Sequence, residues 1–337
     1  MHYERIIKRA FQVTWRHKAL WIFGIVAALF GGMRGGSGNG QGVQYALNSG
    51  DMGQLQSFAP WLSRGDWQRL VPMVLGLLAL MAIVGVIMLI VNIIVRYTSL
   101  GALIGMVGEI EEKGETRFKS GLQTGWNRLL RLFAINLIIG LATGVIVIVL
   151  LLLLGVVAAA GAIPAALMIS AGRTLRVLGI IVAIVAGLIV LLLMFLVFAA
   201  LSALVTLVHE FSFRACVLER LGVFAALSAG IELVRGRLRE GILFWLLLLG
   251  IDIALSLAAV PLVLLGLGGA LVSGLVAFGL TESVGVGFLV GLPIVVVIVL
   301  ASIFVGGLYL TFRSAAWTLA FRDLRGTAEP AGVTHLI

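Results

Sequence analysis

The stretch LVPMVLGLLALMAIVGVIMLIVNIIV, residues 70–95, decides the fold class of this chain. It is longer than the roughly 20 apolar residues that an α-helix needs to cross the hydrocarbon core of a bilayer, and Asn92 is its only strongly polar residue. Four similar runs follow at residues 132–158, 177–208, 242–267 and 286–312. The shorter run at 19–33 is a sixth candidate, because Trp21 can anchor one end at the membrane surface. The sequence therefore predicts an all-α polytopic membrane protein with six transmembrane helices.

The composition excludes a soluble fold of this length. The chain has 337 residues, of which 61% are hydrophobic and 12% are charged, whereas a soluble domain carries about 25% charged residues. Its mean hydropathy is +1.17. The net charge of +9 lies in short segments between the apolar runs, which is typical of basic residues that face anionic lipid headgroups. We therefore expect membrane lipids as partners, and we expect no nucleic acid.

Residues 1–33 also allow a second interpretation, a secretory signal peptide, because a basic segment precedes a short apolar run. The polar segment, however, is 18 residues long and amphipathic, and no clear small-x-small cleavage site precedes the glycine-rich stretch. We therefore favour a retained first span.

The distribution of Lys and Arg predicts the orientation of the chain, because cytoplasmic loops carry an excess of both. With the N-terminus in the cytoplasm, 19 of the 24 basic residues lie on the cytoplasmic side. The other five, on the outer side, are Arg34, Arg64, Arg69, Arg173 and Arg176. Arg outnumbers Lys twenty to four, which favours a GC-rich bacterial genome. We expect a bacterial cytoplasmic (inner) membrane protein with both termini in the cytoplasm.

Each cytoplasmic basic segment has an apolar stripe at helical spacing with basic residues opposite, which is typical of a helix lying in the membrane interface. The stripes are Tyr3, Ile6, Ile7, Ala10, Phe11, Thr14 and Trp15; Phe118, Gly121, Leu122, Gly125, Trp126, Leu129, Leu130 and Phe133; and Leu227, Ile231, Val234 and Leu238. The residues predicted to contact lipid headgroups are Arg5, Lys8, Arg9, Arg16, Lys18, Arg128, Arg131, Arg235 and Arg239.

The register of these segments recurs. When Trp15, Trp126 and Val234 are aligned, a small residue falls five positions earlier each time, at Ala10, Gly121 and Ala229. A second echo follows each even-numbered span: residues 97–102 (YTSLGA), 211–216 (FSFRAC) and 310–315 (LTFRSA) each read large apolar, hydroxyl, two variable, small, small.

The echoes predict three parallel repeats of about 110 residues, each an interfacial helix, a span, an outer loop and a second span. Within one membrane domain, 1–337, the repeats are 1–108, 109–220 and 221–325, and 326–337 form a C-terminal tail. The alternative is that any membrane hairpin with a basic inner loop produces such echoes.

A few polar residues lie inside or beside the spans. Asp252 is ten residues into the run 242–267, near the expected bilayer midplane, with no Lys or Arg inside a span to pair with it. A charge there costs at least about 2.5–3.5 kcal/mol, so Asp252 is either a proton or cation relay or a protonated hydrogen-bonding group. His209 and Glu210 either gate a path or mark the water boundary. Asn92 and Asn136 are predicted to hydrogen-bond between helices.

Glycine is abundant in two contexts. The segment 35–42 (GGSGNGQG) lacks the Gly-Lys-Ser/Thr ending of a phosphate-binding loop, so we interpret it as a linker. Small-xxx-small patterns at Gly101/Gly105, Gly140/Gly144, Gly266/Ala270/Gly274 and Gly287/Gly291 predict close helix packing, either within the chain, which we favour, or in a dimer.

No enzyme signature is present in the sequence. It contains no Ser-His-Asp set, HExxH, Walker motif or dinucleotide fingerprint, Cys216 is the single cysteine, and the four histidines are far apart. We therefore expect no catalysis, no cofactor and no metal site, although an intramembrane enzyme needs few residues.

The layout resembles the membrane region of bacterial glycerophosphoryl diester phosphodiesterases and their stand-alone relatives. The similar features are Trp15-Arg16 leading into residues 18–24 (KALWIFG), Gly125-Trp126, and Phe213-Arg214-Ala215. The resemblance implies a membrane domain, and it carries over no catalytic residue, because those enzymes hold catalysis in a separate soluble barrel.

Two functions remain open. The first is a non-enzymatic scaffold or accessory subunit, or a protein that organises lipid, with protein partners or a second copy of the chain. The alternative is a transporter or channel for a small or lipid-like solute, with Asp252 in its path.

Overall fold

The computed structural model describes residues 2–31, 67–170, 173–281 and 283–326, and these residues form helices without any strand. The glycine-rich segment 35–42 and the tail 327–337 lie outside the described residues. The helices are α1 (Tyr3–Arg16), α2 (Ala19–Gly31), α4 (Trp67–Lys113), α5 (Phe118–Ser170), α6 (Arg173–Leu218), α7 (Val223–Gly236), α8 (Leu238–Thr281) and α9 (Val284–Arg325).

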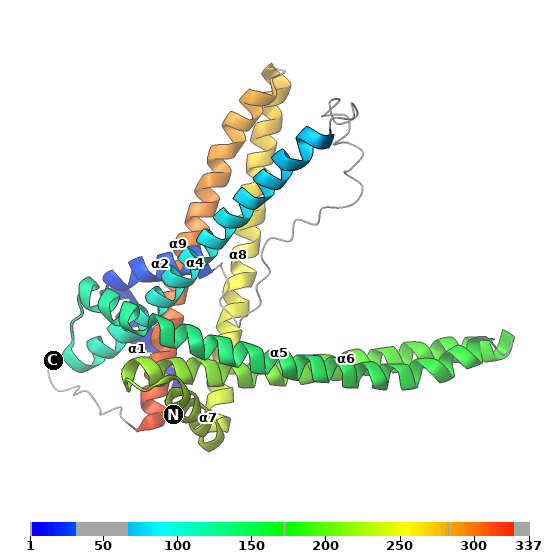
Figure 1. The fold of residues 1–337 in the computed structure, drawn as a ribbon, viewed down its shortest axis with the longest axis horizontal. Coiled ribbons are helices and arrows are strands. Elements are labelled where there is room, and N and C mark those ends of the chain that lie inside the picture. Colours follow the sequence, from blue (N-terminus) through cyan, green and yellow to red (C-terminus); the bar gives the residue numbers. More distant parts are fainter. Residues whose placement is uncertain (1, 32–66, 171–172, 282, 327–337) are drawn as a thin grey trace.

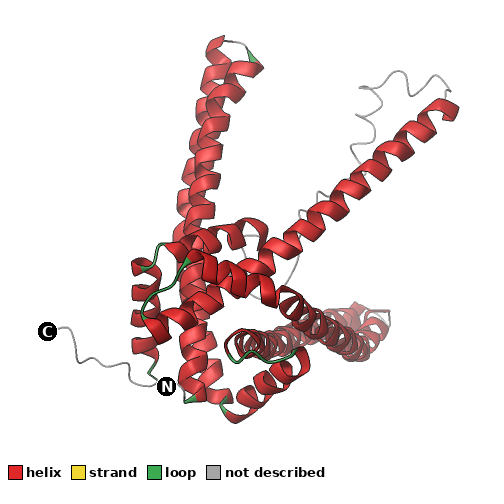
Figure 2. Ribbon diagram, turned by 60° about the vertical axis from the view of Figure 1, so that its left-hand side comes forward, coloured by secondary structure: helices red, strands yellow, loops and turns green. Residues whose placement is uncertain are grey.

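The molecule consists of a packed hub and three arms that diverge from it (Figures 1 and 2). We define the hub as α1, α2, α7 and residues 93–113, 118–139, 203–218, 238–252 and 306–325. The α4 arm is 67–92, the α5–α6 arm is 140–202 and the α8–α9 arm is 253–305. Of the buried hydrophobic residues that the structure describes, only Leu154 and Ala270 lie in the arms. Protein therefore covers the hub, whereas the arms leave their apolar side chains uncovered.

Five described helices are long and apolar enough to cross a membrane. The helices α4, α5, α6, α8 and α9 contain 42 to 53 residues, or about 63–80 Å at 1.5 Å per residue. The hydrocarbon core is only about 30 Å thick, so each long helix has length for both a span and a share of the hub. The helix α2 has 13 residues, which is short for a span.

The hub core contains all three echo segments, 97–102, 211–216 and 310–315. Glycines approach the backbone or hydroxyl of the second residue of each echo: a Cβ on Gly125 would overlap the carbonyl oxygen of Thr98, one on Gly230 would overlap Ser212, and one on Gly24 would overlap Thr311. The hydroxyl-small pattern therefore marks the places where helices cross most closely.

The amphipathic segments pack on α9, α4 and α6, the three long helices that contain an echo segment. The helix α1 packs on α9, the first turns of α5 pack on α4, and α7 packs on α6. The prediction of a separate interfacial helix before the third span was wrong, because that segment is continuous with the span in α5. Because α1 packs on α9, the first and the last described helices meet in the hub.

The apolar stripe of each amphipathic segment divides into two faces. Ala10, Gly121 and Gly230 are buried against the hub, whereas Trp15 and Trp126 are 59% and 61% exposed. In α7 the small residue five positions before Val234, Ala229, is half-buried, whereas Ala226 and Gly230 are buried. The small residues thus allow backbone contact on the face that packs on the hub. The aromatic rings lie on the other face, which is exposed.

The structure confirms close packing within the chain for some of the predicted glycine patterns. Gly274, Gly287 and Gly291 bring the backbones of α8 and α9 together, and Gly101 faces the Cα of Gly125. Gly140 and Gly144 would meet no atom within 4 Å if a Cβ were added. For that pair the prediction of packing inside the chain was wrong.

Candidate functional site

The strongest candidate site is a set of charged side chains inside the hub, where α6, α8 and α9 meet. Asp252 of α8 accepts a hydrogen bond from the Tyr309 hydroxyl, and its Oδ2 lies 3.2 Å from Nη1 of Arg313. Tyr309 and Arg313 are one turn apart on α9, so both reach the same carboxylate from one face of that helix. The side chains of Arg313 and Asp252 are only 9% and 17% exposed.

A second ion pair lies on α6. Arg214 donates to Oε2 of Glu210 at 2.5 Å and to the carbonyl oxygen of Glu210 at 2.7 Å. Its other terminal nitrogen reaches across to the carbonyl oxygen of Ser314 on α9 at 3.3 Å. The Arg214 side chain is 2% exposed, and its guanidinium carbon lies 6.0 Å from the centre of the Trp317 ring. This arginine therefore ties α6 to α9 through the centre of the hub.

The two ion pairs meet on α9, because Arg214 donates to the carbonyl oxygen of Ser314, the residue next to Arg313. Two carboxylates and two guanidiniums balance to zero net charge. Removing one member of a buried pair leaves an uncompensated charge, which costs about 3–5 kcal/mol. The geometry therefore indicates a network whose members depend on one another.

Asn136 and His209 extend this region towards α5. The Asn136 side-chain oxygen lies 3.1 Å from Nε2 of His209, and the His209 ring lies 4.1 Å from the Phe213 ring, centre to centre. The prediction that Asn136 hydrogen-bonds between helices is confirmed. His209 and Glu210 are more than markers of the water boundary, since both have partners inside the protein.

Asn92 is separate from the network. Its amide nitrogen donates to the carbonyl oxygen of Phe30 on α2 at 2.7 Å, which confirms the predicted hydrogen bond between helices. The five predicted polar residues therefore divide into one network around Glu210 and Asp252 and one isolated contact.

The expectation that Asp252 has no cation to pair with was wrong. Asp252 lies 14 residues from the first residue of α8 and 29 residues from its last, at the edge of the hub. Its cation is Arg313, one residue beyond the predicted last span. The predicted run began at residue 242, whereas α8 begins at Leu238. The pairing of α8 with α9 depends on tertiary packing, which the apolar run alone does not show.

Sequence reasoning missed three members of the network, Arg214, Arg313 and Tyr309. The signal that could have found them is the echo itself. Arg214 and Arg313 occupy the same position in the second and third echoes, and each follows a polar partner, Glu210 or Tyr309, by four residues. That is one helical turn, the spacing at which side chains on a helix meet.

The predicted headgroup contacts lie on the hub surface. Arg128 is half-buried, and the other eight are exposed. Two of them have acidic partners: Lys8 lies 2.7 Å from Glu4, and Arg9 of α1 lies 2.9 Å from Glu111 of α4. Arg16, Arg235 and Arg239 take part in none of the ion pairs found among the described residues. These three exposed cations are therefore free to contact anionic headgroups.

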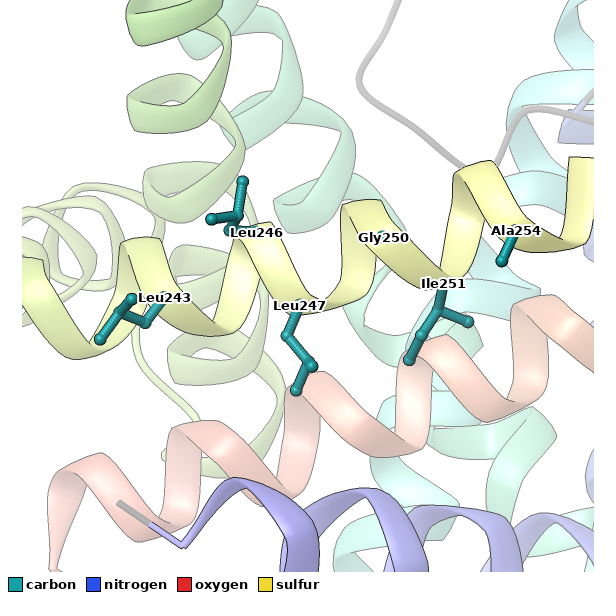
Figure 3. A pocket seen from close by; sticks show the side chains of 6 residues that line it. All are labelled: Leu243, Leu246, Leu247, Gly250, Ile251 and Ala254. Carbon is teal, nitrogen blue, oxygen red and sulfur yellow. The ribbon is translucent and has the colours of Figure 1, made fainter.

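Two hollows adjoin the hub. An apolar groove of about 500 Å³ follows one side of α8, lined by Leu243, Leu246, Leu247, Gly250, Ile251 and Ala254 (Figure 3). A polar hollow of about 380 Å³ lies among α4, α5 and the end of α6, with Glu109, Glu112, Lys113, Arg128 and Arg220 among its lining residues. Within the described ranges, no three His, Cys, Asp or Glu side chains gather to hold a metal ion.

Comparisons with protein-family models, with curated proteins and with solved structures give no match to this chain.

Proposed function

We propose that this chain is a non-enzymatic integral membrane protein that organises lipid and acts as a scaffold or accessory subunit. The observation that carries the proposal is the contrast between hub and arms. The hub is packed by protein and its internal charges neutralise one another, whereas most of the described apolar side chains of the arms are exposed. A rigid centre with apolar arms provides surface for lipids, protein partners or a second copy of the chain.

The proposal includes six spans in a bacterial cytoplasmic membrane, with both termini in the cytoplasm. The helices within the arms are 22 to 31 residues long, or about 33–46 Å, which suits a bilayer crossing with some tilt. The short α2 completes the set by pairing with α4 and α9. The hub apart from α2 then lies at the inner surface, where its exposed arginines face anionic headgroups.

The proposal also includes three parallel repeats of about 110 residues. Two features support it: each echo segment lies in the hub core with a glycine against its second residue, and each amphipathic segment packs beside one echo-bearing helix end. The packing of α1 on α9 follows the same rule as α5 on α4 and α7 on α6. One repeated unit, present three times in the chain, accounts for all three contacts.

The test of lipid organisation uses proteoliposomes that contain a tail-labelled fluorescent phosphatidylglycerol. Clustering of this anionic lipid by the exposed arginines increases its self-quenching. We expect the double substitution Arg235→Gln and Arg239→Gln to reduce the protein-dependent quenching by about half, because each basic residue near the surface contributes about 1 kcal/mol. The matched control, Arg235→Lys with Arg239→Lys, keeps both charges and should keep the quenching. Equal quenching by all three proteins would contradict a lipid-organising role.

The transporter alternative is tested in the same vesicles, loaded with a pH-sensitive dye and held at a potassium diffusion potential. A scaffold gives no proton flux above that of protein-free vesicles. Asp252→Asn with Arg313→Gln removes the carboxylate without leaving its partner charged, so lost flux would not merely reflect an unpaired arginine. Flux in the parent protein that this double variant abolishes would establish transport and refute the scaffold proposal.

A further inference from the structure

The polar hollow among α4, α5 and α6 has one wall whose charges are satisfied. On α4, Glu109 accepts a hydrogen bond from Thr116 at 3.0 Å and lies 3.5 Å from Lys113. Glu112 lies 3.9 Å from Nη1 of Arg322, which also donates to the carbonyl oxygen of Gly108 at 3.3 Å. Both carboxylates on this wall therefore already have cationic partners.

The opposite wall carries two arginines without acidic partners. Arg128 of α5 and Arg220, just after α6, line the hollow, and neither takes part in an ion pair within the part of the chain that the structure describes. Thr124 and Asn127 of α5 line the same hollow and add a hydroxyl and an amide that can donate hydrogen bonds. This wall combines two guanidiniums with neutral donors.

Arg220 has an unusual backbone conformation for its residue type. Its φ is 57°, the one positive φ found among non-glycine residues in the described ranges, and it follows the last residue of α6 by two positions. Glycine is the residue that usually ends a helix in this left-handed conformation, because a side chain there costs energy. An arginine at this position, with its side chain lining the hollow, indicates a binding role for the guanidinium.

From these observations we infer that the hollow binds a phosphate group. Arginine's planar fork of donors matches the oxygens of a phosphate, and about 380 Å³ accommodates a phosphate with a small substituent. The phosphate belongs either to an anionic lipid headgroup or to a soluble phosphate monoester. The inference deepens the proposed function, which assigns the basic residues only to general surface contact. Binding of a soluble phosphate monoester would not require the proposed function to be correct.

The experiment uses the full chain, purified in a neutral detergent, in two arms. Calorimetric titration with inorganic phosphate tests a soluble ligand. Native mass spectrometry with equimolar phosphatidic acid and phosphatidylcholine tests a lipid headgroup. We expect Arg128→Gln and Arg220→Gln each to weaken phosphate binding, or retention of phosphatidic acid, about tenfold, since each removes a charge-assisted contact. The matched control is Arg237→Gln, between α7 and α8, which removes one exposed charge outside the lining of the hollow and should leave binding unchanged.

Arg220→Gly separates binding from folding. Glycine adopts the left-handed conformation without strain, so this variant should unfold at an equal or higher temperature and still bind about tenfold more weakly. Binding in the calorimeter assigns a soluble phosphate ligand, and selective retention of phosphatidic acid alone assigns a headgroup. Absence of binding in both arms, or the same loss in Arg237→Gln as in the two hollow variants, overturns the inference. If the parent protein binds phosphate but causes no clustering of the anionic lipid, the proposed function alone is refuted.

Discussion

Asp252 shows how single residues hold this molecule together. It receives the Tyr309 hydroxyl and the Arg313 guanidinium from successive turns of α9, while Glu210 holds Arg214 on α6 in the same way. Because Arg214 also reaches Ser314, both arginines link α9 to a neighbouring helix. At the scale of residues, the charges inside the hub neutralise one another in pairs, and the contacts of the two arginines link α9 to α6 and α8.

The crosslink is tested with a double-mutant cycle on Asp252 and Arg313. Asp252→Asn leaves the guanidinium of Arg313 inside the hub without its anion, so we expect a loss of about 3–5 kcal/mol in the free energy of unfolding. Arg313→Gln should cost a similar amount, and the double variant should cost clearly less than the sum. Denaturant titration in detergent, followed by circular dichroism, measures all three.

The matched control is Glu232→Gln, which removes an exposed carboxylate on α7. It should change the free energy of unfolding by no more than about 0.5 kcal/mol. Additive costs for Asp252 and Arg313, or an unchanged stability of Asp252→Asn, would show that the pair does not hold α8 to α9.

At the scale of helices, close backbone crossings decide how the hub assembles. A Cβ on Gly125 would overlap the carbonyl oxygen of Thr98, which belongs to a rigid helix and cannot rotate aside. Gly140, fifteen residues later on the same helix, faces open space. The two glycines differ in what they contact, although the sequence presents both inside one apolar α-helix.

The substitutions Gly125→Ala and Gly140→Ala separate these roles. Gly125→Ala should lower the free energy of unfolding by about 1–3 kcal/mol, because α4 and α5 must move apart. Gly140→Ala is the matched control, and it should be neutral or up to about 1 kcal/mol stabilising, because alanine is the better helix former. The same unfolding titration measures both. A crossing at Gly125 is refuted if both variants unfold alike.

The helical class of the chain follows from the apolar runs, because their length and composition suffice to predict long apolar helices. The echoes likewise pointed to three segments, 97–102, 211–216 and 310–315, and all three lie in the hub core. The echo and Glu210 point to Arg214, but its link to α9 could not be predicted, because the acceptor is a backbone oxygen one hundred residues away. Residues 118–133 show the same limit. Their apolar stripe is visible in the sequence, whereas its division into a glycine face and a tryptophan face depends on where α4 lies.

At the scale of the whole molecule, the arms diverge widely from the hub (Figures 1 and 2). Helices that cross one flat bilayer are tilted by about 0–40° from its normal. If all three arms are spans, a bilayer must draw them towards a common direction, with the junctions between hub and arms as the places that bend. The packed hub would keep its internal contacts during this change.

Spin labels at the ends of two arms test this movement. In a Cys216→Ala background, cysteines replace Ser170, at the end of α5, and Thr281, at the end of α8. We expect the distance between the labels, measured by pulsed electron resonance, to shorten when the protein passes from micelles to lipid nanodiscs. A matched pair within the hub, at Lys119 and Ser228, should keep its distance. Arm ends that stay apart in nanodiscs would contradict a common crossing direction.

The background substitution is chosen from the echoes. Cys216 is fully buried and aligns with Ala102 and Ala315, so alanine already occupies the equivalent place in the other two echoes. Removing the single cysteine therefore gives a chain in which every label is placed by design.

The most direct test of the account is labelling of single cysteines in intact cells with a maleimide that cannot cross membranes. The account predicts that Ser170→Cys and Thr281→Cys react from outside, that Leu152→Cys in the middle of an arm does not react, and that Ser228→Cys on the hub reacts only after permeabilisation. Reaction of Leu152→Cys with the impermeant reagent, or of Ser228→Cys in intact cells, would show that lipid does not surround the arms or that the hub does not face the cytoplasm.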